Sequence, residues 1–177
     1  MTRHSKRSVR TVALIGSLLA AGIALSGCSA VTDLFGGGAQ RDENNQITEE
    51  ANIDVFSLEV GDCMSSADLT GTITAVDVLP CTQPHAAEVF FEFDLEGTVF
   101  PDEDTILAAV EAQCVPAFAE FVGTEYFEST LDLRWILPTE ETWDQADDRL
   151  VQCFILQPDE SGEGAVEVTG SLEDSGL

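Results

Sequence analysis

The sequence predicts a small α+β domain with a largely antiparallel sheet, one main helix and two disulfides. Three observations lead to this prediction. Several short segments alternate polar and apolar residues with the two-residue period of a half-buried strand. One segment alone has the three- and four-residue spacing of a long helix, and four cysteines lie within a stretch of about 105 residues. The element order β-β-β-α-β-β is typical of an α+β domain.

Five segments have the composition of strands. Residues 55–60 alternate in part and end at a Gly–Asp turn, whereas 72–78 and 88–95 show the two-residue rhythm more clearly. The segments 131–137 and 150–156 are short and apolar, and they follow the helical region. We therefore expect three strands before the helix and two after it.

The long helix is predicted between two residues that favour helix ends. Asp102 or Asp104 can cap its start, because a carboxylate oxygen accepts hydrogen bonds from free backbone N–H groups, and Gly123 can end it. Pro116 lies inside the segment and is expected to kink or divide the helix near Gln113. Its apolar face is formed by Ile106, Leu107, Val110, Cys114, Phe118, Phe121 and Val122.

Four cysteines belong to the predicted domain: Cys63, Cys81, Cys114 and Cys153. An even number in a small exported domain favours two disulfides. Three pairings are possible, and spacing alone does not choose among them. We prefer Cys63–Cys81, which joins the ends of adjacent predicted strands, and Cys114–Cys153, which ties the helix to the last strand. The chain-entropy model gives upper values of about 3 and about 4 kcal/mol for these bonds.

A metal or thiol site is the competing interpretation of these cysteines. The Cys81-x3-His85 spacing can ligate zinc, and a cysteine beside a histidine can act as a nucleophile. The chain has no Cys-x2-Cys pair, however, and a disulfide would consume the thiol. It also lacks a phosphate-binding Gly-rich loop, Gly-x-Ser-x-Gly and His-Glu-x-x-His. We therefore expect no catalytic residues, no metal and no cofactor.

The charge of the chain is distributed unevenly. It has 33 acidic and 7 basic residues, a net charge of −26, but four of the basic residues lie within the first ten positions. From Cys28 onward, three basic residues remain against 33 acidic ones, a net charge of −30, and none of them is lysine. This composition argues against a nucleic-acid partner and against adhesion to anionic lipid, since both require clustered basic side chains.

The N-terminus has the features of an export signal. Residues 1–27 combine a basic start with the apolar run 12–25, which is too short for a comfortable membrane span. The run ends in Leu25-Ser26-Gly27-Cys28, which resembles the bacterial lipobox, in which the cysteine receives a diacylglyceryl group. Two acyl chains give stable anchoring. We therefore expect lipidation at Cys28 and attachment to the outer face of the cell membrane.

Composition divides the rest of the chain into three parts. Residues 28–52 are rich in Gly, Asn, Gln and acidic side chains, and they are predicted to be the lipidated cysteine followed by a flexible acidic tether. Residues 53–157 contain the predicted strands, helix and disulfides, and form the α+β domain. Residues 158–177 are rich in Gly, Ser and Glu, which predicts a disordered acidic tail.

A set of short motifs runs through the predicted core: Gly61-Asp62-Cys63, Pro80-Cys81-Thr82-Gln83-Pro84-His85-Ala86-Ala87-Glu88-Val89, Cys114, Pro138-Thr139, Trp143, Asp148-Arg149 and Cys153. Together they resemble the septum-formation domain family of exported or membrane-anchored proteins from high-GC Gram-positive bacteria. The resemblance spans roughly 56–156. Asp147 stands where the family's usual Gly-Asp-Arg has glycine, a departure that can alter a turn.

The resemblance implies a link to cell division or envelope growth, without an established reaction. It marks Asp62, His85, Glu88, Trp143 and Arg149 as candidates for a shared surface or an internal network. The leading hypothesis is a non-enzymatic lipoprotein that binds an envelope protein or wall component. The alternatives are a small-ligand or metal-binding module centred on His85, Glu88 and Trp143, and a secreted enzyme.

Overall fold

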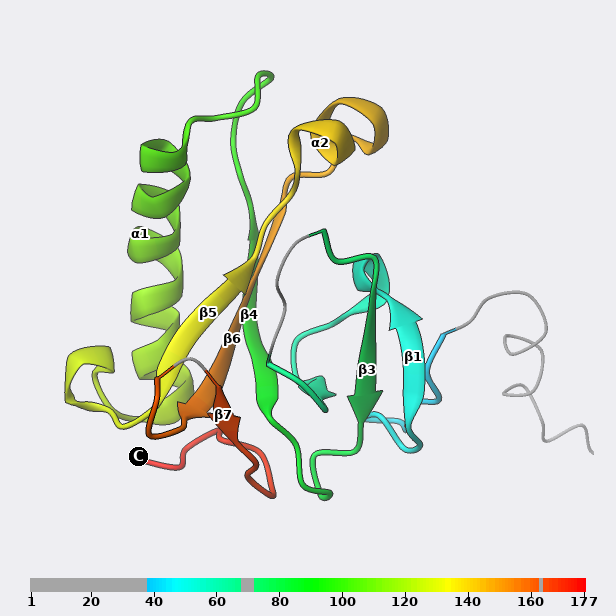
Figure 1. Ribbon diagram of the computed structural model, residues 1–177, viewed down its shortest axis with the longest axis vertical. Helices are drawn as coiled ribbons and strands as arrows, with labels where there is room; N and C mark the ends of the chain where they lie inside the picture. Colours follow the sequence, from blue (N-terminus) through cyan, green and yellow to red (C-terminus); the bar gives the residue numbers. More distant parts are fainter. Residues whose placement is uncertain (1–37, 68–71, 163) are drawn as a thin grey trace, which may run out of the picture. The chain divides into compact units, whose positions relative to one another are not determined.

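The computed structural model describes residues 38–67, 72–162 and 164–177, which form a curled antiparallel sheet with a long helix on one face (Figure 1). The predicted signal peptide 1–27 and the lipidation site Cys28 lie outside the described residues. The elements are β1 (Ala51–Asp54), η2 (Val55–Ser57), β2 (Cys63–Met64), β3 (Ala75–Leu79), β4 (Ala87–Asp94), α1 (Glu103–Val122), η3 (Tyr126–Glu128), β5 (Asp132–Ile136), α2 (Glu140–Ala146), β6 (Leu150–Pro158) and β7 (Ala165–Val166).

The strand order is β1-β3-β2-β4-β6-β5, with β7 paired to β6, and every pairing is antiparallel. The predicted α+β class with one main helix is therefore confirmed. Both preferred disulfides are also confirmed. Cys63–Cys81 joins β2 to the loop after β3, with Cα atoms 5.3 Å apart. Cys114–Cys153 joins α1 to β6, with Cα atoms 6.1 Å apart.

One predicted strand is wrong. The segment 55–60 begins with the short 3₁₀ helix η2, and the first strand, β1, precedes it. The turn forms because the side chain of Asp54 accepts a hydrogen bond from the Phe56 N–H at 2.9 Å, which favours a helical start over an extended chain. The other four predicted strands correspond to β3, β4, β5 and β6, with ends that differ by at most three residues.

Helix α1 begins and ends as predicted but is not divided. Asp102 caps its start by accepting a hydrogen bond from Thr105 N–H, and Gly123 ends it with a φ of +84°. The helix runs without a break through Pro116, and its total length is 20 residues. Burial of Cys114 and Phe118 on either side of the proline, together with the Cys114 disulfide, holds both halves against the sheet. Leu107, predicted on the buried face, is 41% exposed.

Within the described residues, α1 is the one helix long and apolar enough to cross a membrane. Its contacts are those of a core helix instead. Its buried side chains pack against β4, β5 and β6 in one apolar cluster, and it is covalently joined to β6. A second cluster fills the inside of the curled sheet between β1, β3, β4 and β6. Strand β6 contributes to both clusters, with Val151, Cys153 and Ile155 on one face and Phe154 and Leu156 on the other.

The predicted flexible tether is wrong for its described part, residues 38–52. Arg41 and Ile47 form a backbone bridge that closes a small loop, and Ile47 is buried in the cluster inside the sheet. Strand β1 then begins at Ala51, within the predicted tether. The apolar side chain of Ile47 and the cation of Arg41, which binds Asp62, help to fix the loop to the domain, and averaged composition does not reveal such contacts.

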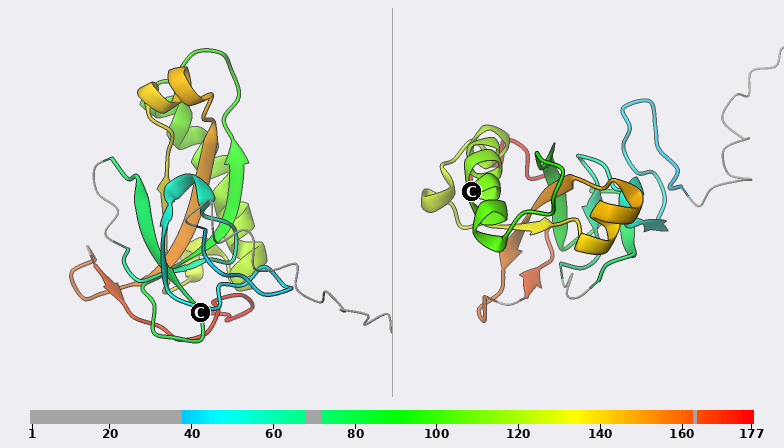
Figure 2. Two further views of the ribbon diagram at one scale, coloured as in Figure 1. Left: turned by 90° about the vertical axis from the view of Figure 1, so that its right-hand side faces the viewer. Right: turned by 90° about the horizontal axis from the view of Figure 1, so that it is seen from above.

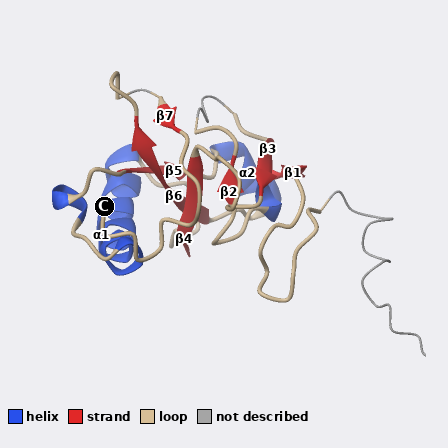
Figure 3. Ribbon diagram, turned by 90° about the horizontal axis from the view of Figure 1, so that it is seen from below, coloured by secondary structure: helices blue, strands red, loops and turns tan. Residues whose placement is uncertain are grey.

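The predicted disordered tail, residues 158–177, is also wrong. After β7 the chain crosses the sheet, Leu172 is buried in the cluster beneath α1, and the C-terminus lies beside that helix (Figures 2 and 3). The backbone N–H groups of Asp174 and Gly176 donate to carbonyl groups in the last turn of α1 at 2.8 and 2.9 Å. These carbonyls have no partner within a helix, so the tail supplies what the helix end requires. We call residues 165–177 the C-terminal strap.

Candidate functional site

The residues marked by the sequence motifs lie in three places. His85 and Glu88 are buried together at the start of β4, and Asp62 directly precedes β2, the neighbouring strand. Trp143 and Arg149 lie beyond the opposite end of the β4–β6 ladder, on α2 and just before β6. No single site contains His85, Glu88 and Trp143, so the predicted ligand module built from all three is wrong in that form.

The C-terminal strap covers His85 and Glu88. His85 and Val168 exchange two backbone hydrogen bonds of 2.9 Å. The two carboxylate oxygens of Glu88 accept separate hydrogen bonds, Oε1 from the Ser171 hydroxyl and Oε2 from the Leu172 N–H, both at 2.7 Å. The strap therefore provides the polar partners that make burial of this carboxylate tolerable.

Burial raises the pKa of Glu88, because the charged form loses its hydration, while the hydrogen bonds from Leu172 and Ser171 act in the opposite direction. The His85 ring is oriented by the carbonyl oxygen of Gln83, 3.0 Å from Nδ1. This contact places the ring proton on Nδ1, since a carbonyl only accepts. Nε2 is left buried, without a hydrogen-bond partner among the described residues.

One group of potential metal ligands contains the sulfur of Cys63, the His85 ring and the Glu88 carboxylate, whose ligand atoms lie within 4.8 Å of one another. Cys63 is bonded to Cys81, so neither sulfur is a thiolate. Both oxygens of Glu88 already accept hydrogen bonds. The oxidised domain thus offers one unengaged nitrogen, and the group does not fit a zinc site, which takes four ligands.

Asp62 forms the most deeply buried ion pair among the described residues. Its carboxylate, 1% exposed, accepts two hydrogen bonds from Arg41, Nη1 to Oδ1 at 2.6 Å and Nη2 to Oδ2 at 2.8 Å. It also accepts the Glu59 N–H at 2.9 Å. The hydrogen bonds that the guanidinium donates to Asp62 raise the pKa of Arg41. Sequence analysis missed Arg41, although it is one of only three basic residues after the signal segment.

Arg149 and Trp143 form a second internal pair. The guanidinium carbon of Arg149 lies 3.6 Å from the centroid of the indole ring, and Nη1 donates to the Trp143 carbonyl at 3.0 Å. Nη2 forms an ion pair of 2.8 Å with Asp147. Asp147 ends α2 with a φ of +56°, the left-handed conformation that glycine adopts most readily. The departure from glycine therefore keeps the turn and adds a charge next to Arg149.

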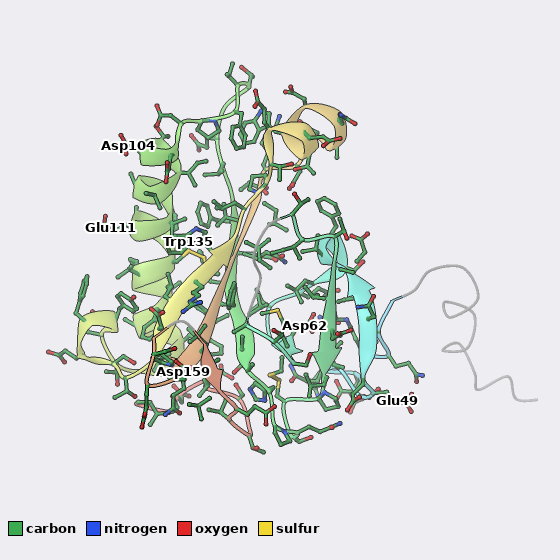
Figure 4. All side chains as sticks on the ribbon, viewed as in Figure 1. Glu49, Asp62, Asp104, Glu111, Trp135 and Asp159 are labelled. Atoms are coloured by element: carbon green, nitrogen blue, oxygen red, sulfur yellow. A yellow bond between two sulfur atoms is a disulfide. The ribbon has the colours of Figure 1, made fainter. Side chains whose placement is uncertain are left out.

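A pocket that the sequence did not predict lies at one mouth of the curled sheet. It has a volume of about 410 Å³ and is lined by segments 54–56, 72–74 and 135–142 together with residues at the start of β6. Both edge strands of the sheet, β1 and β5, contribute to it. The indole of Trp135 packs with the cluster on the side of β5 that faces α1 (Figure 4). The pocket combines the segment 135–142 with segments that lie about 60 and about 80 residues earlier in the chain, so no local pattern marks it.

Comparison with known proteins gives one match. A family model described as septum formation matches residues 32–176, nearly all of the described chain and the C-terminal strap with it. No curated protein and no solved structure matches the chain.

Proposed function

Since the chain belongs to the septum-formation family, which suggests a role associated with the envelope or the septum, we propose that it is a membrane-anchored extracytoplasmic lipoprotein that acts there by binding a partner rather than by catalysis. The observation that carries this proposal is the internal engagement of the motif residues. Asp62, Glu88 and Arg149 are each held by neighbours within the domain, and His85 is fully buried.

The thiol chemistry of the domain supports a non-enzymatic role. All four cysteines of the domain are bonded in disulfides, so none is a nucleophile or a metal-binding thiolate. The lone histidine of this part of the chain lies beneath the C-terminal strap, where substrate does not reach it. A nucleophile paired with an accessible base is what covalent catalysis requires.

The lipobox and the charge support anchoring through Cys28. The chain from Cys28 onward, with its net charge of −30, is repelled by anionic headgroups, so its attachment depends on the acyl chains. Arg41, which is fixed to the domain by Asp62, lies 13 positions after Cys28. Such a segment spans at most about 45 Å, which limits how far the domain extends from the membrane.

The test is the distribution of the tagged protein in cells, with the epitope inserted within residues 36–38, because the C-terminal strap is part of the fold. We expect the wild-type chain in the membrane fraction and enriched at the septum, and Cys28→Ala in the soluble extracytoplasmic fraction. Membrane attachment unchanged in Cys28→Ala would contradict the anchor. A uniform distribution around the cell, with normal division after deletion, would contradict the septal role.

A further inference from the structure

We propose that the pocket at the mouth of the sheet binds a large apolar side chain from a basic, extended segment of a partner protein. This inference rests on the proposed function as an interaction module, and it assigns that function a site and a partner chemistry. Four features of the described residues support it: the walls of the pocket, one exposed aromatic ring, the position of the sheet edges and the charge around the opening.

The walls of the pocket are mostly apolar. A volume of about 410 Å³ falls within the usual range for binding pockets, about 300–1,000 Å³. The apolar lining residues include Val55, Phe56, Ile73, Ile136, Pro138 and Leu150. Gln152 lies at the buried end, held in place because its Nε2 donates to the Leu58 carbonyl at 2.7 Å. Mouths of curled sheets and barrels are common positions for ligand sites.

Phe56 stands exposed at the opening of this pocket. Its side chain belongs to η2 and is 56% exposed, although it is a large apolar group next to an apolar cavity. The hydrogen bond from its own N–H to Asp54 fixes the turn that presents it. Exposed aromatic side chains beside a pocket are typical of the few residues that carry most of the affinity in protein interfaces.

The edges of the sheet lie at the same place. In the described chain β1 pairs with β3 alone and β5 with β6 alone, and residues from both edge strands line the pocket. The curled sheet is therefore open where the pocket lies. Extended peptides commonly bind by adding to such an edge while a side chain enters an adjacent pocket. This arrangement favours an extended occupant over a helical one.

Charge complementarity identifies the occupant as basic. Asp54 and Asp148 line the pocket, and the adjacent helix α2 exposes Glu140, Glu141 and Asp144. The basic residues after Cys28 are all paired within the domain, Arg41 with Asp62, Arg134 with Asp132 and Arg149 with Asp147. The arginines of the domain are thus already engaged, so lysine or arginine from a partner would be needed to neutralise the acidic side chains around the pocket.

The experiment measures fluorescence anisotropy of labelled peptides with the full chain in phosphatidylcholine nanodiscs at physiological salt. The probe is Gly-Lys-Arg-Phe-Leu-Lys-Arg-Gly. One control peptide replaces Phe-Leu with Ser-Ser, and a second replaces every basic residue with Glu. We expect saturable binding of the probe alone, weakened about tenfold or more by Phe56→Ser. Asp54→Asn, which keeps an oxygen to cap η2, should weaken binding about two- to fivefold.

Phe127→Ser is the matched control, since Phe127 is also an exposed phenylalanine (86%) but does not line the pocket. It should leave the affinity unchanged. Absent binding of the probe, equal binding of the Ser-Ser peptide, or equal weakening by Phe56→Ser and Phe127→Ser would overturn the proposal. Peptide binding tests the pocket, whereas septal enrichment tests the proposed function. Failure of one proposal is therefore distinguishable from failure of the other.

Discussion

The Glu88 carboxylate accepts the backbone N–H of Leu172 at 2.7 Å, across 84 positions of sequence. This bond fixes the end of the chain to the central strand β4. Ser171 donates to the other carboxylate oxygen, and Leu172 buries its own side chain beneath α1. A segment with the composition of a disordered tail is thereby part of the core.

Removing the C-terminal strap from Val168 onward should destabilise the domain strongly. The deletion uncovers Glu88, removes the buried side chain of Leu172 and leaves the last carbonyls of α1 without the N–H groups of Asp174 and Gly176. Loss of a buried leucine side chain alone costs about 2–5 kcal/mol. Denaturant unfolding of the truncated and full chains measures the difference. A change below about 0.5 kcal/mol would show that the segment contributes nothing to the fold.

Glu88→Gln should change how stability depends on pH. Burial raises the pKa of Glu88 in the folded protein above its ordinary value of 4.5. At pH values between the ordinary and the raised pKa, the folded protein therefore holds a proton that the unfolded chain has lost. The stability that this carboxyl group contributes is thus present at low pH and lost as pH rises through the folded pKa. The free energy of unfolding of Glu88→Gln, minus that of the wild type, should therefore increase from about pH 4.5 upward.

The matched control for that series is Glu92→Gln, an exposed glutamate in the same strand. Its difference from the wild type should stay nearly constant over the same pH range. A Glu88→Gln difference that is equally flat, measured by denaturant unfolding at several pH values, would contradict the assigned effect of burial.

Arg41→Ala should cost about 2–4 kcal/mol of unfolding free energy, because it leaves the buried Asp62 carboxylate with only the Glu59 N–H. Arg134→Ala is the comparison, since its pair with Asp132 is about one-third exposed and such pairs contribute about 0–1 kcal/mol. Thermal and denaturant unfolding of both variants measure the contrast. Equal effects would mean that the loop around Arg41 is not fixed by Asp62.

Asp147→Gly should be more stable than Asp147→Ala by about 1 kcal/mol. Both variants lose the ion pair with Arg149, but only alanine carries a Cβ into the left-handed conformation at φ +56°. Comparing these two variants with each other removes the contribution of the lost charge. The measurement is denaturant unfolding, and equal stabilities would contradict a left-handed residue 147.

Periodicity and residue chemistry predicted the features that depend on local sequence. The helix between Asp102 and Gly123 and four of the strands follow from spacing and caps. The preferred disulfide pairs follow from where the four cysteines lie relative to those predicted strands and that helix. The strap was not predicted because backbone groups make most of its hydrogen bonds with the domain, and Leu172 is its main buried apolar side chain. The Arg41–Asp62 pair and the pocket escaped because each joins segments that are distant in the chain.

The same reasoning explains why the motif residues did not form one site. Asp62, Glu88 and Arg149 are charged motif residues, yet each one bonds to different neighbours and stabilises a different part of the fold. Residue type predicted that they would have polar partners. It did not predict which partners, because those of Asp62 come from the loop around Arg41, those of Glu88 from the C-terminal strap and those of Arg149 from α2 and its end.

The most direct test of the account is complementation of a deletion strain by Glu88→Gln, with cell length as the measurement. The central claim is that the buried motif residues serve the fold and that partner binding serves the septum. At equal amounts of folded, disulfide-bonded protein, we expect Glu88→Gln to restore the cell-length distribution of the wild type. Elongated cells that persist despite wild-type amounts of folded Glu88→Gln protein would contradict that claim.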